Sequence, residues 1–186
     1  MRVTREQAAQ NRERVVDVAG ELFRTKGFDG IGVADLMQAA GLTHGGFYGN
    51  FASKEALEVE ASRKALDATA AFVKKLVAES DDPLGAIVRF YLSHAHRDGI
   101  GEGCAISALS QDAVRAGPAL RGVFEAAIRD YLSVLAELVR GDTEAERFKR
   151  SMVTYSTMVG ALQLARTVTD QKLSDTILAA AVEALV

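Results

Sequence analysis

The chain of 186 residues contains one cysteine, two prolines and no tryptophan. A single cysteine excludes a disulfide framework within the chain and any zinc finger built on several cysteines. No run approaches the roughly 18 apolar residues that a membrane-spanning helix needs. The polar start, Met-Arg-Val-Thr-Arg-Glu-Gln, lacks the apolar stretch of a signal peptide. We therefore expect a cytoplasmic protein that does not bind membranes.

The charges nearly cancel, with 25 acidic against 22 basic side chains and a formal net charge of −3. This balance excludes a protein that is basic all over, but it leaves room for a local nucleic-acid-binding face. Hydrophobic residues make up 48% of the chain, which is enough for a packed core.

Apolar residues recur at helical spacing along almost the whole chain, and no alternating strand pattern of useful length is present. We therefore predict an all-α fold. Thr4 and Gln7 match a capping box at the start of the first helix, and Gly27 is placed to end it. The other predicted helices cover approximately 33–40, 44–50, 53–76, 82–92, 105–115, 119–140, 143–169 and 174–186.

The two short helices predicted at 33–40 and 44–50 are joined by a turn that contains Gly41, which is a helix-turn-helix pattern. Phe47 and Phe51 are the expected core anchors of the second helix. Its adjacent glycines, Gly45 and Gly46, cost about 1 kcal/mol each relative to alanine in a helix. Such residues suit a backbone that approaches another surface closely, and the second helix is therefore the candidate recognition element in a DNA major groove.

The runs GFDGIGVADL (27–36) and AGLTHGGFYGNFASKEAL (40–57) resemble the DNA-binding domain of the TetR/AcrR family of transcriptional regulators. The resemblance implies a helix-turn-helix domain over residues 1–56 and a helical effector-binding and dimerisation domain over residues 57–186. It also implies a homodimer that binds a palindromic operator in double-stranded DNA. We expect a repressor that a small effector releases from DNA, with no cofactor and no enzymatic activity.

The family's DNA contacts carry over to individual positions. Thr43, Tyr48 and Lys54 match phosphate contacts, and His44, Gly45 and Gly46 match positions that face the bases. Asn50 stands where the family most often has histidine or tyrosine, and we expect it to contact a phosphate as a hydrogen-bond donor. Gly32 stands where serine or threonine caps the second helix. In the N-terminal arm, Arg2 and Arg5 are placed to reach phosphates or a minor groove.

Residues 1–56 carry seven basic and seven acidic side chains. Few cations are therefore available to neutralise phosphates, and we expect a modest salt dependence of DNA binding.

The two helices predicted at 119–140 and 143–169 have a very short connection, so we expect them to pack antiparallel as a hairpin. In the family, the last long helices of two subunits form a four-helix interface. The small residues Gly160, Ala161 and Ala165 would allow close helix approach there, although packing within one subunit is the alternative.

An effector pocket is expected between the middle helices, and the scarcity of charge among its candidate residues favours an apolar or aromatic ligand. The candidates are Phe90, Tyr91, His94, Cys104, Phe124, Tyr131, Tyr155 and Met158. For each of them except Cys104, ordinary core packing is the alternative.

Cys104 stands at the predicted start of a helix, where the helix dipole stabilises a thiolate. The stretch 103–110 resembles a subgroup of the family that senses electrophiles or oxidants through a cysteine. The alternatives are a small buried apolar residue and a helical cysteine-dependent enzyme that uses His94 or His96. A helical module whose N-terminal pair binds protein rather than DNA is a further alternative.

Overall fold

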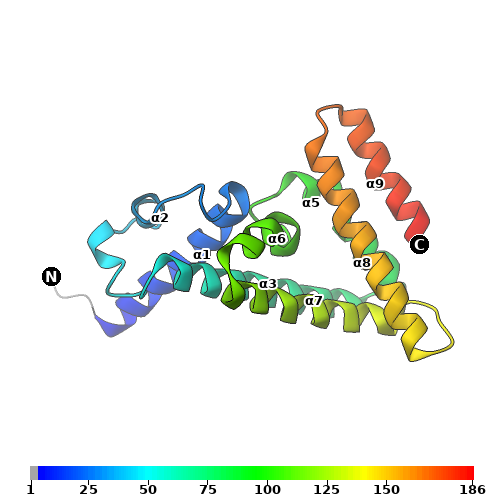
Figure 1. Cartoon of the computed structure of the whole chain (residues 1–186), viewed down its shortest axis with the longest axis horizontal. Coiled ribbons are helices and arrows are strands. Elements are labelled where there is room, and N and C mark those ends of the chain that lie inside the picture. Colours follow the sequence, from blue (N-terminus) through cyan, green and yellow to red (C-terminus); the bar gives the residue numbers. More distant parts are fainter. Residues whose placement is uncertain (1–3) are drawn as a thin grey trace.

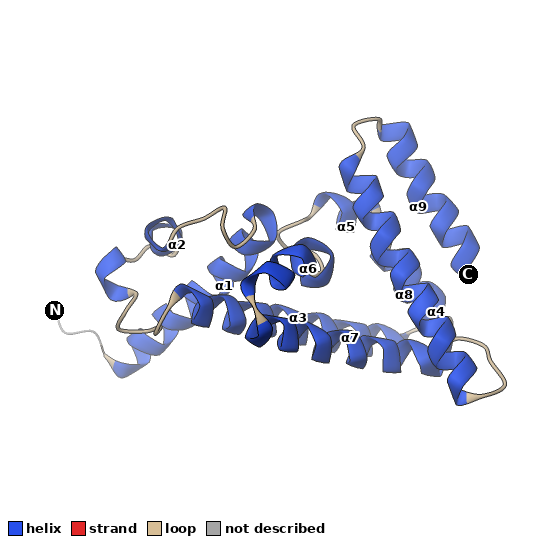
Figure 2. Cartoon of the chain, in the orientation of Figure 1, coloured by secondary structure: helices blue, strands red, loops and turns tan. Residues whose placement is uncertain are grey.

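The computed structural model describes residues 4–186, so the predicted contact of Arg2 lies outside the described residues. Within 4–186 every regular element is a helix, which confirms the all-α prediction (Figure 2). None of these helices is long and apolar enough to cross a membrane. The elements are α1 (Arg5–Lys26), α2 (Val33–Ala39), the 3-10 turn η1 (His44–Gly46), α3 (Lys54–Glu79), α4 (Pro83–Tyr91), α5 (His94–Asp98), α6 (Ala105–Ala116), α7 (Pro118–Leu138), α8 (Glu144–Thr167) and α9 (Gln171–Leu185).

Helices α3 and α7 follow the long axis of the molecule, with α1 and α2 at one end and the α8–α9 pair rising from the other (Figure 1). Helix α3 packs against α1 and also against α7. Residues 1–56 and 57–186 therefore share one continuous helix, which connects the helix-turn-helix end to the rest of the molecule.

The hydrophobic core extends into the N-terminal end of the molecule. The almost completely buried residues there are Phe23 of α1, Leu36 and Met37 of α2, Phe47 directly after η1, and Leu57 of α3. These residues come from the helical stripe of α1 and from the predicted inward positions of the short helices, so apolar burial holds α2 and η1 against α1 and α3.

Side-chain caps define most helix N-termini. Ser53 accepts a hydrogen bond from the N–H of Ala56 at the start of α3, and Asp82 caps α4. Thr143 and Glu146 form a capping box at the start of α8. Each cap satisfies a backbone N–H that has no partner within the helix.

The predicted capping box of α1 is only half formed. Thr4 accepts from the N–H of Gln7, but the Gln7 amide donates to Asn11 instead of turning back to Thr4. At the other end, Gly27 has a φ of 76° and ends the helix as predicted.

Two boundaries in the C-terminal region differ from the prediction. The last helix begins at Gln171 rather than at Ser174, because the Asp170 carboxylate caps it. A separate short helix, α5, follows α4, because Ser93 accepts from the N–H of His96 and begins a new turn.

The hairpin predicted for 119–140 and 143–169 is wrong in its angle. Helix α8 returns across α7 steeply, whereas α8 and α9 lie side by side (Figure 1). Ala161 and Ala165 are buried within the subunit. Only Gly160 of the three predicted interface residues is exposed, and no atom lies within 4 Å of where its Cβ would be.

Candidate nucleic-acid interface and effector cavity

The segment after α2 is a turn rather than the second short α-helix predicted for 44–50. Gly41, with a φ of 70°, ends α2, and the N–H of Leu42 bonds to the carbonyl of Met37. One 3-10 turn, His44–Gly46, follows, and turns without a regular helix continue to Asn50. The adjacent glycines explain the difference, because glycine loses more backbone entropy in a helix than any other residue.

This turn presents an exposed surface on an apolar anchor. Phe47 is fully buried and Phe51 is 4% exposed, while the neighbouring Tyr48 is 68% exposed. Thr43 and His44 are also exposed. The rings of Phe47 and Phe51 therefore fix the turn to the core, and the polar side chains between α2 and α3 point outward.

Gly45 is exposed and has open space around it. A Cβ at this position would meet no heavy atom within 4 Å, whereas at Gly46 it would lie 3.6 Å from the Met37 methyl group. The fold itself therefore does not require glycine at position 45. Gly32 and Thr43 stand at helix N-caps, but neither provides a side-chain cap, so the Thr43 hydroxyl is not used to cap η1.

Two residues predicted to contact phosphates are bonded within the protein. The Lys54 ammonium donates to the Phe28 carbonyl oxygen at 2.5 Å and lies 3.6 Å from the Glu58 carboxylate. The Asn50 amide donates to the Gly46 carbonyl at 2.7 Å. Both side chains therefore stabilise the domain, which the sequence resemblance did not predict.

The remaining cations near this surface are few. Arg5 is exposed at the first position of α1. Arg12 is paired with Glu60 at 2.5 Å and lies over the Phe51 ring at 4.7 Å, so it joins α1 to α3. These pairings agree with the expectation that few charges are available for phosphates.

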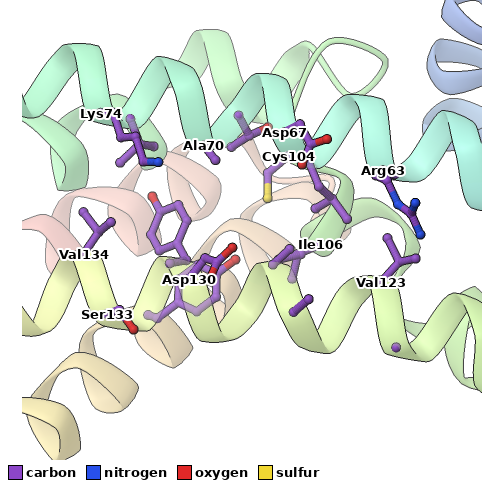
Figure 3. A pocket seen from close by; sticks show the side chains of 18 of the residues that line it. Arg63, Asp67, Ala70, Lys74, Cys104, Ile106, Val123, Asp130, Ser133 and Val134 are labelled. Carbon is purple, nitrogen blue, oxygen red and sulfur yellow. The ribbon is translucent and has the colours of Figure 1, made fainter.

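Two adjoining cavities lie in the C-terminal region, of about 630 Å³ and 440 Å³. Both are lined by Thr69 and Val73 of α3, Tyr131 of α7, and Cys104. In Figure 3 the larger cavity lies between α3 and α7, and the Cys104 sulfur points into it. Their size suits a small organic ligand.

Five of the eight predicted pocket residues line these cavities. Cys104 and Tyr131 line both, Tyr155 lines the larger one, and Phe90 and Tyr91 line the smaller one.

The other three pocket candidates do not line these two cavities. Phe124 and Met158 are buried in the core and line neither cavity. His94 lies in an open groove beside α9, where its Nε2 is 3.2 Å from Asp175. The break at Ser93 begins a new helix there, so His94 does not follow the inward stripe of α4.

Cys104 is buried at the N-cap of α6. Its backbone N–H donates to Nε2 of His96 at 3.0 Å, and Nδ1 of His96 lies 2.7 Å from the carbonyl oxygen of Tyr91. The ring is therefore neutral with its proton on Nδ1, and burial lowers the pKa of His96. Because both nitrogens are bonded to backbone groups, His96 is not placed as a general base for the thiol.

A polar network that sequence reasoning missed holds α5 and α6 against α8. Arg166 donates to the carbonyl oxygens of His96 and Arg97 at 2.6 Å and 3.0 Å, and to the Ser107 hydroxyl at 3.1 Å. Burial lowers the pKa of Arg166. The only sequence signal is a charged residue among small and apolar residues of α8.

Comparisons with known proteins agree with this architecture. The family model for bacterial regulatory proteins of the tetR family matches residues 15–61. No curated protein sequence matches the chain. Among solved structures, a TetR transcriptional regulator from Chloroflexus aurantiacus is 27% identical, with a TM-score of 0.83 over 97% of this chain and 94% of that one.

Two further structures share the fold. The reduced form of NemR from E. coli is 21% identical, with a TM-score of 0.81 over 95% of each chain. A TetR-family transcriptional regulator from Cytophaga hutchinsonii is 22% identical, with a TM-score of 0.80 over 96% of this chain and 94% of that one. Residues 15–61 of this chain therefore match the tetR family, and the described residues share the fold of solved TetR-family transcriptional regulators.

Proposed function

We propose that the chain is a repressor that binds a palindromic operator as a homodimer and leaves it when a small molecule fills the cavity beside Cys104. The observation that carries this proposal is the exposed turn of Thr43–Tyr48, held on buried aromatic anchors at the end of the molecule farthest from α8 and α9 (Figure 1). In a dimer joined through α8 and α9, two such ends point away from the interface.

The exposed turn supplies the groups that read a major groove. His44 presents ring nitrogens to base edges, and the open backbone at Gly45 permits close approach. The hydroxyls of Thr43 and Tyr48 are placed for phosphate oxygens. Gly46 lies partly under this surface. Gly32, at the exposed start of α2, permits a backbone contact, and Arg5 supplies a cation on α1.

The dimer interface is assigned to one face of α8 and α9. Val153 and Leu164 of α8 are 60% and 59% exposed, and Leu173 of α9 is 46% exposed. Gly160 lies between the first two along α8, with no side chain to hold a second helix away. An exposed apolar face of this kind is typical of a subunit interface.

The link between cavity and DNA is α3, which lines both cavities and also packs against α1. We assign DNA binding to residues 1–56 and effector binding and dimerisation to 57–186. Two recognition turns must be about 34–36 Å apart to meet successive major grooves. A ligand that favours another spacing weakens operator binding by the ratio of its affinities for the two arrangements.

The test is selection of DNA from a random duplex pool by the purified full-length chain, at two salt concentrations. We expect enrichment of one palindrome, at a centre-to-centre spacing of half-sites near 10 base pairs or a multiple of it. A folded dimer that enriches no sequence, or only an unpaired half-site, contradicts the proposal.

A thiol sensor that uses Cys104 is a second candidate, because its side chain lines both cavities although it is only 5% exposed. In this version a thiol-reactive molecule, rather than a reversible ligand, weakens operator binding. Treatment with iodoacetamide should then release the wild-type protein from the selected operator and leave Cys104→Ser bound. Equal responses of both proteins eliminate the sensor.

A further inference from the structure

Two tyrosine hydroxyls at the cavities have no partner in the protein. Among residues 4–186, the hydroxyls of Tyr91 and Tyr155 are buried and form no hydrogen bond. The two residues are 2% and 5% exposed. Native proteins rarely leave a buried hydroxyl without a partner, so such a group points to a ligand.

The two hydroxyls belong to one site, although they come from different helices. Tyr91 of α4 lines the smaller cavity and Tyr155 of α8 lines the larger one. Their rings meet edge to face with centroids 6.3 Å apart. Burial raises the pKa of both tyrosines, and the nearby Cys104 side chain, a weak hydrogen-bond acceptor, raises it further in each case. Both hydroxyls therefore stay protonated, and an oxygen acceptor would suit them better than the sulfur.

The charges around the cavities favour a neutral ligand. Arg63 and Lys74 of the larger cavity are matched by Asp67 and Asp130, and all four are labelled around the Cys104 sulfur in Figure 3. The smaller cavity has one side chain of each sign.

In the smaller cavity the pair is Arg24 and Glu102. Neither cavity therefore has an excess of positive charge to hold an anion, and the protonated tyrosines carry no charge.

The walls between these charges are apolar and aromatic. Val73, Ile106 and Val134 line the larger cavity, and Phe90 and Ile87 line the smaller one. Tyr131 stacks on Tyr155 with ring centroids 4.4 Å apart and an interplanar angle of 18°. Flat faces of this kind suit a planar hydrocarbon body.

We propose that the effector site takes a neutral, planar, largely apolar molecule with a carbonyl oxygen, which accepts hydrogen bonds from the hydroxyls of Tyr91 and Tyr155 beside Cys104. A carbonyl oxygen has two lone pairs and no proton, so it can accept from two hydroxyl donors at once. This inference rests on the proposed effector cavity and names the chemistry of its ligand.

The experiment compares three naphthalenes of nearly the same shape: 2-acetylnaphthalene, 2-isopropenylnaphthalene and 2-naphthoate. The first is a neutral ketone, the second replaces the oxygen by a methylene group, and the third is an anion. Equilibrium dialysis against the full-length protein, with chromatographic detection of each compound, measures binding directly. The ketone has no alkene for a thiol to add to, so its binding is separate from thiol sensing.

We expect the wild-type protein to bind the ketone at least about tenfold more tightly than the isopropenyl compound, because only the ketone satisfies the buried donors. The carboxylate should bind most weakly. In the Tyr91→Phe/Tyr155→Phe double variant the preference for the ketone should disappear. In the control Ser62→Ala it should persist, because the Ser62 hydroxyl is also buried without a partner but lines neither cavity.

Equal affinity for the ketone and the isopropenyl compound overturns this inference, as does a ketone preference that survives in the double variant. Failure of the ketone to bind at its solubility limit overturns it as well. DNA selection is a separate measurement on the same protein. An operator found without a ketone preference defeats only this inference, and a ketone preference without an operator defeats only the proposed repressor.

Discussion

The guanidinium Nε of Arg24, on α1, donates a hydrogen bond of 2.5 Å to the carbonyl oxygen of Gly101. Arg24 belongs to the helix-turn-helix end, and Gly101 belongs to the loop that leads to Cys104 and α6. The same arginine lines the smaller cavity, and burial lowers its pKa. This contact is therefore a second connection, besides α3, between the cavity and the proposed DNA-binding surface.

Replacing Arg24 with alanine should lower the free energy of unfolding by about 1–2 kcal/mol, because it removes a charged hydrogen bond from a partly buried site. Urea denaturation measures this change. The control is Arg129→Ala, whose exposed pair with Glu125 should contribute below about 0.5 kcal/mol. If both variants lose the same stability, the Arg24 contact has no special role.

Lys54 should contribute to folding stability, whereas Tyr48 should contribute to operator binding. Because the Lys54 ammonium is bonded to Phe28 and Glu58, Lys54→Ala should cost about 1–2 kcal/mol of stability in urea denaturation. Tyr48→Phe removes a hydroxyl from a side chain that is 68% exposed, so the unfolding midpoint should not change. Its affinity for the selected operator should nevertheless fall several-fold. The opposite assignment, an unstable Tyr48→Phe with wild-type operator affinity, contradicts this account.

A charge on the exposed face of α8 should dissociate the dimer. Val153→Glu places a carboxylate on an apolar surface that a second subunit is proposed to cover, and burying an unpaired charge is costly. Sedimentation equilibrium at micromolar concentration should then give a monomer. Ala71→Glu, at an exposed position on α3, is the control and should remain dimeric. A dimeric Val153→Glu places the interface elsewhere.

His96 should make the protein less stable as the pH falls. Burial lowers the folded pKa of His96 from its usual value of 6.5; the hydrogen bond with the Tyr91 carbonyl opposes this shift, and the nearby Arg166 adds to it. The unfolded chain therefore binds more protons between these two pKa values, and stability is full above about pH 6.5 and lost as the pH falls through the folded pKa. Protonation also removes the acceptor for the Cys104 N–H.

Urea midpoints between pH 5 and pH 7.5 measure this effect. His96→Gln should be less stable than the wild type at pH 7.5 but should show a weaker dependence on pH over the same range. The exposed His94 gives the matched variant His94→Gln, which should keep the wild-type slope. If His96→Gln keeps the wild-type dependence of the urea midpoint on pH, His96 is not the source of that dependence.

The helical stripe of α1, the caps of α3, α4 and α8, and the glycine stops at Gly27 and Gly41 were predictable because each depends on local chemistry. The 3-10 turn at His44–Gly46 was not, because a short segment with two glycines is fixed by how Phe47 packs into the core. The same limit applies to the steep packing of α8 on α7.

The choice of pocket residues from the sequence rested on residue type. Tyr91 and Tyr155 line the cavities, but Phe124 and Met158 have the same apolar character and fill the core instead. Which apolar residue meets a cavity depends on the mutual packing of several helices. The pairings of Lys54 and Arg24 were hidden for a similar reason, since their partners are backbone carbonyls of segments distant in sequence.

Gly45→Ala tests whether the turn of Thr43–Tyr48 contacts DNA. The added methyl group meets no atom of the protein, and Gly45 is not among the glycines with positive φ, so the unfolding midpoint should stay at the wild-type value. Operator affinity, measured by fluorescence anisotropy, should fall at least about tenfold, which corresponds to about 1.4 kcal/mol. Asp81→Ala, exposed in the loop between α3 and α4, should bind like the wild type. A stable Gly45→Ala protein with wild-type operator affinity would show that this turn does not contact DNA.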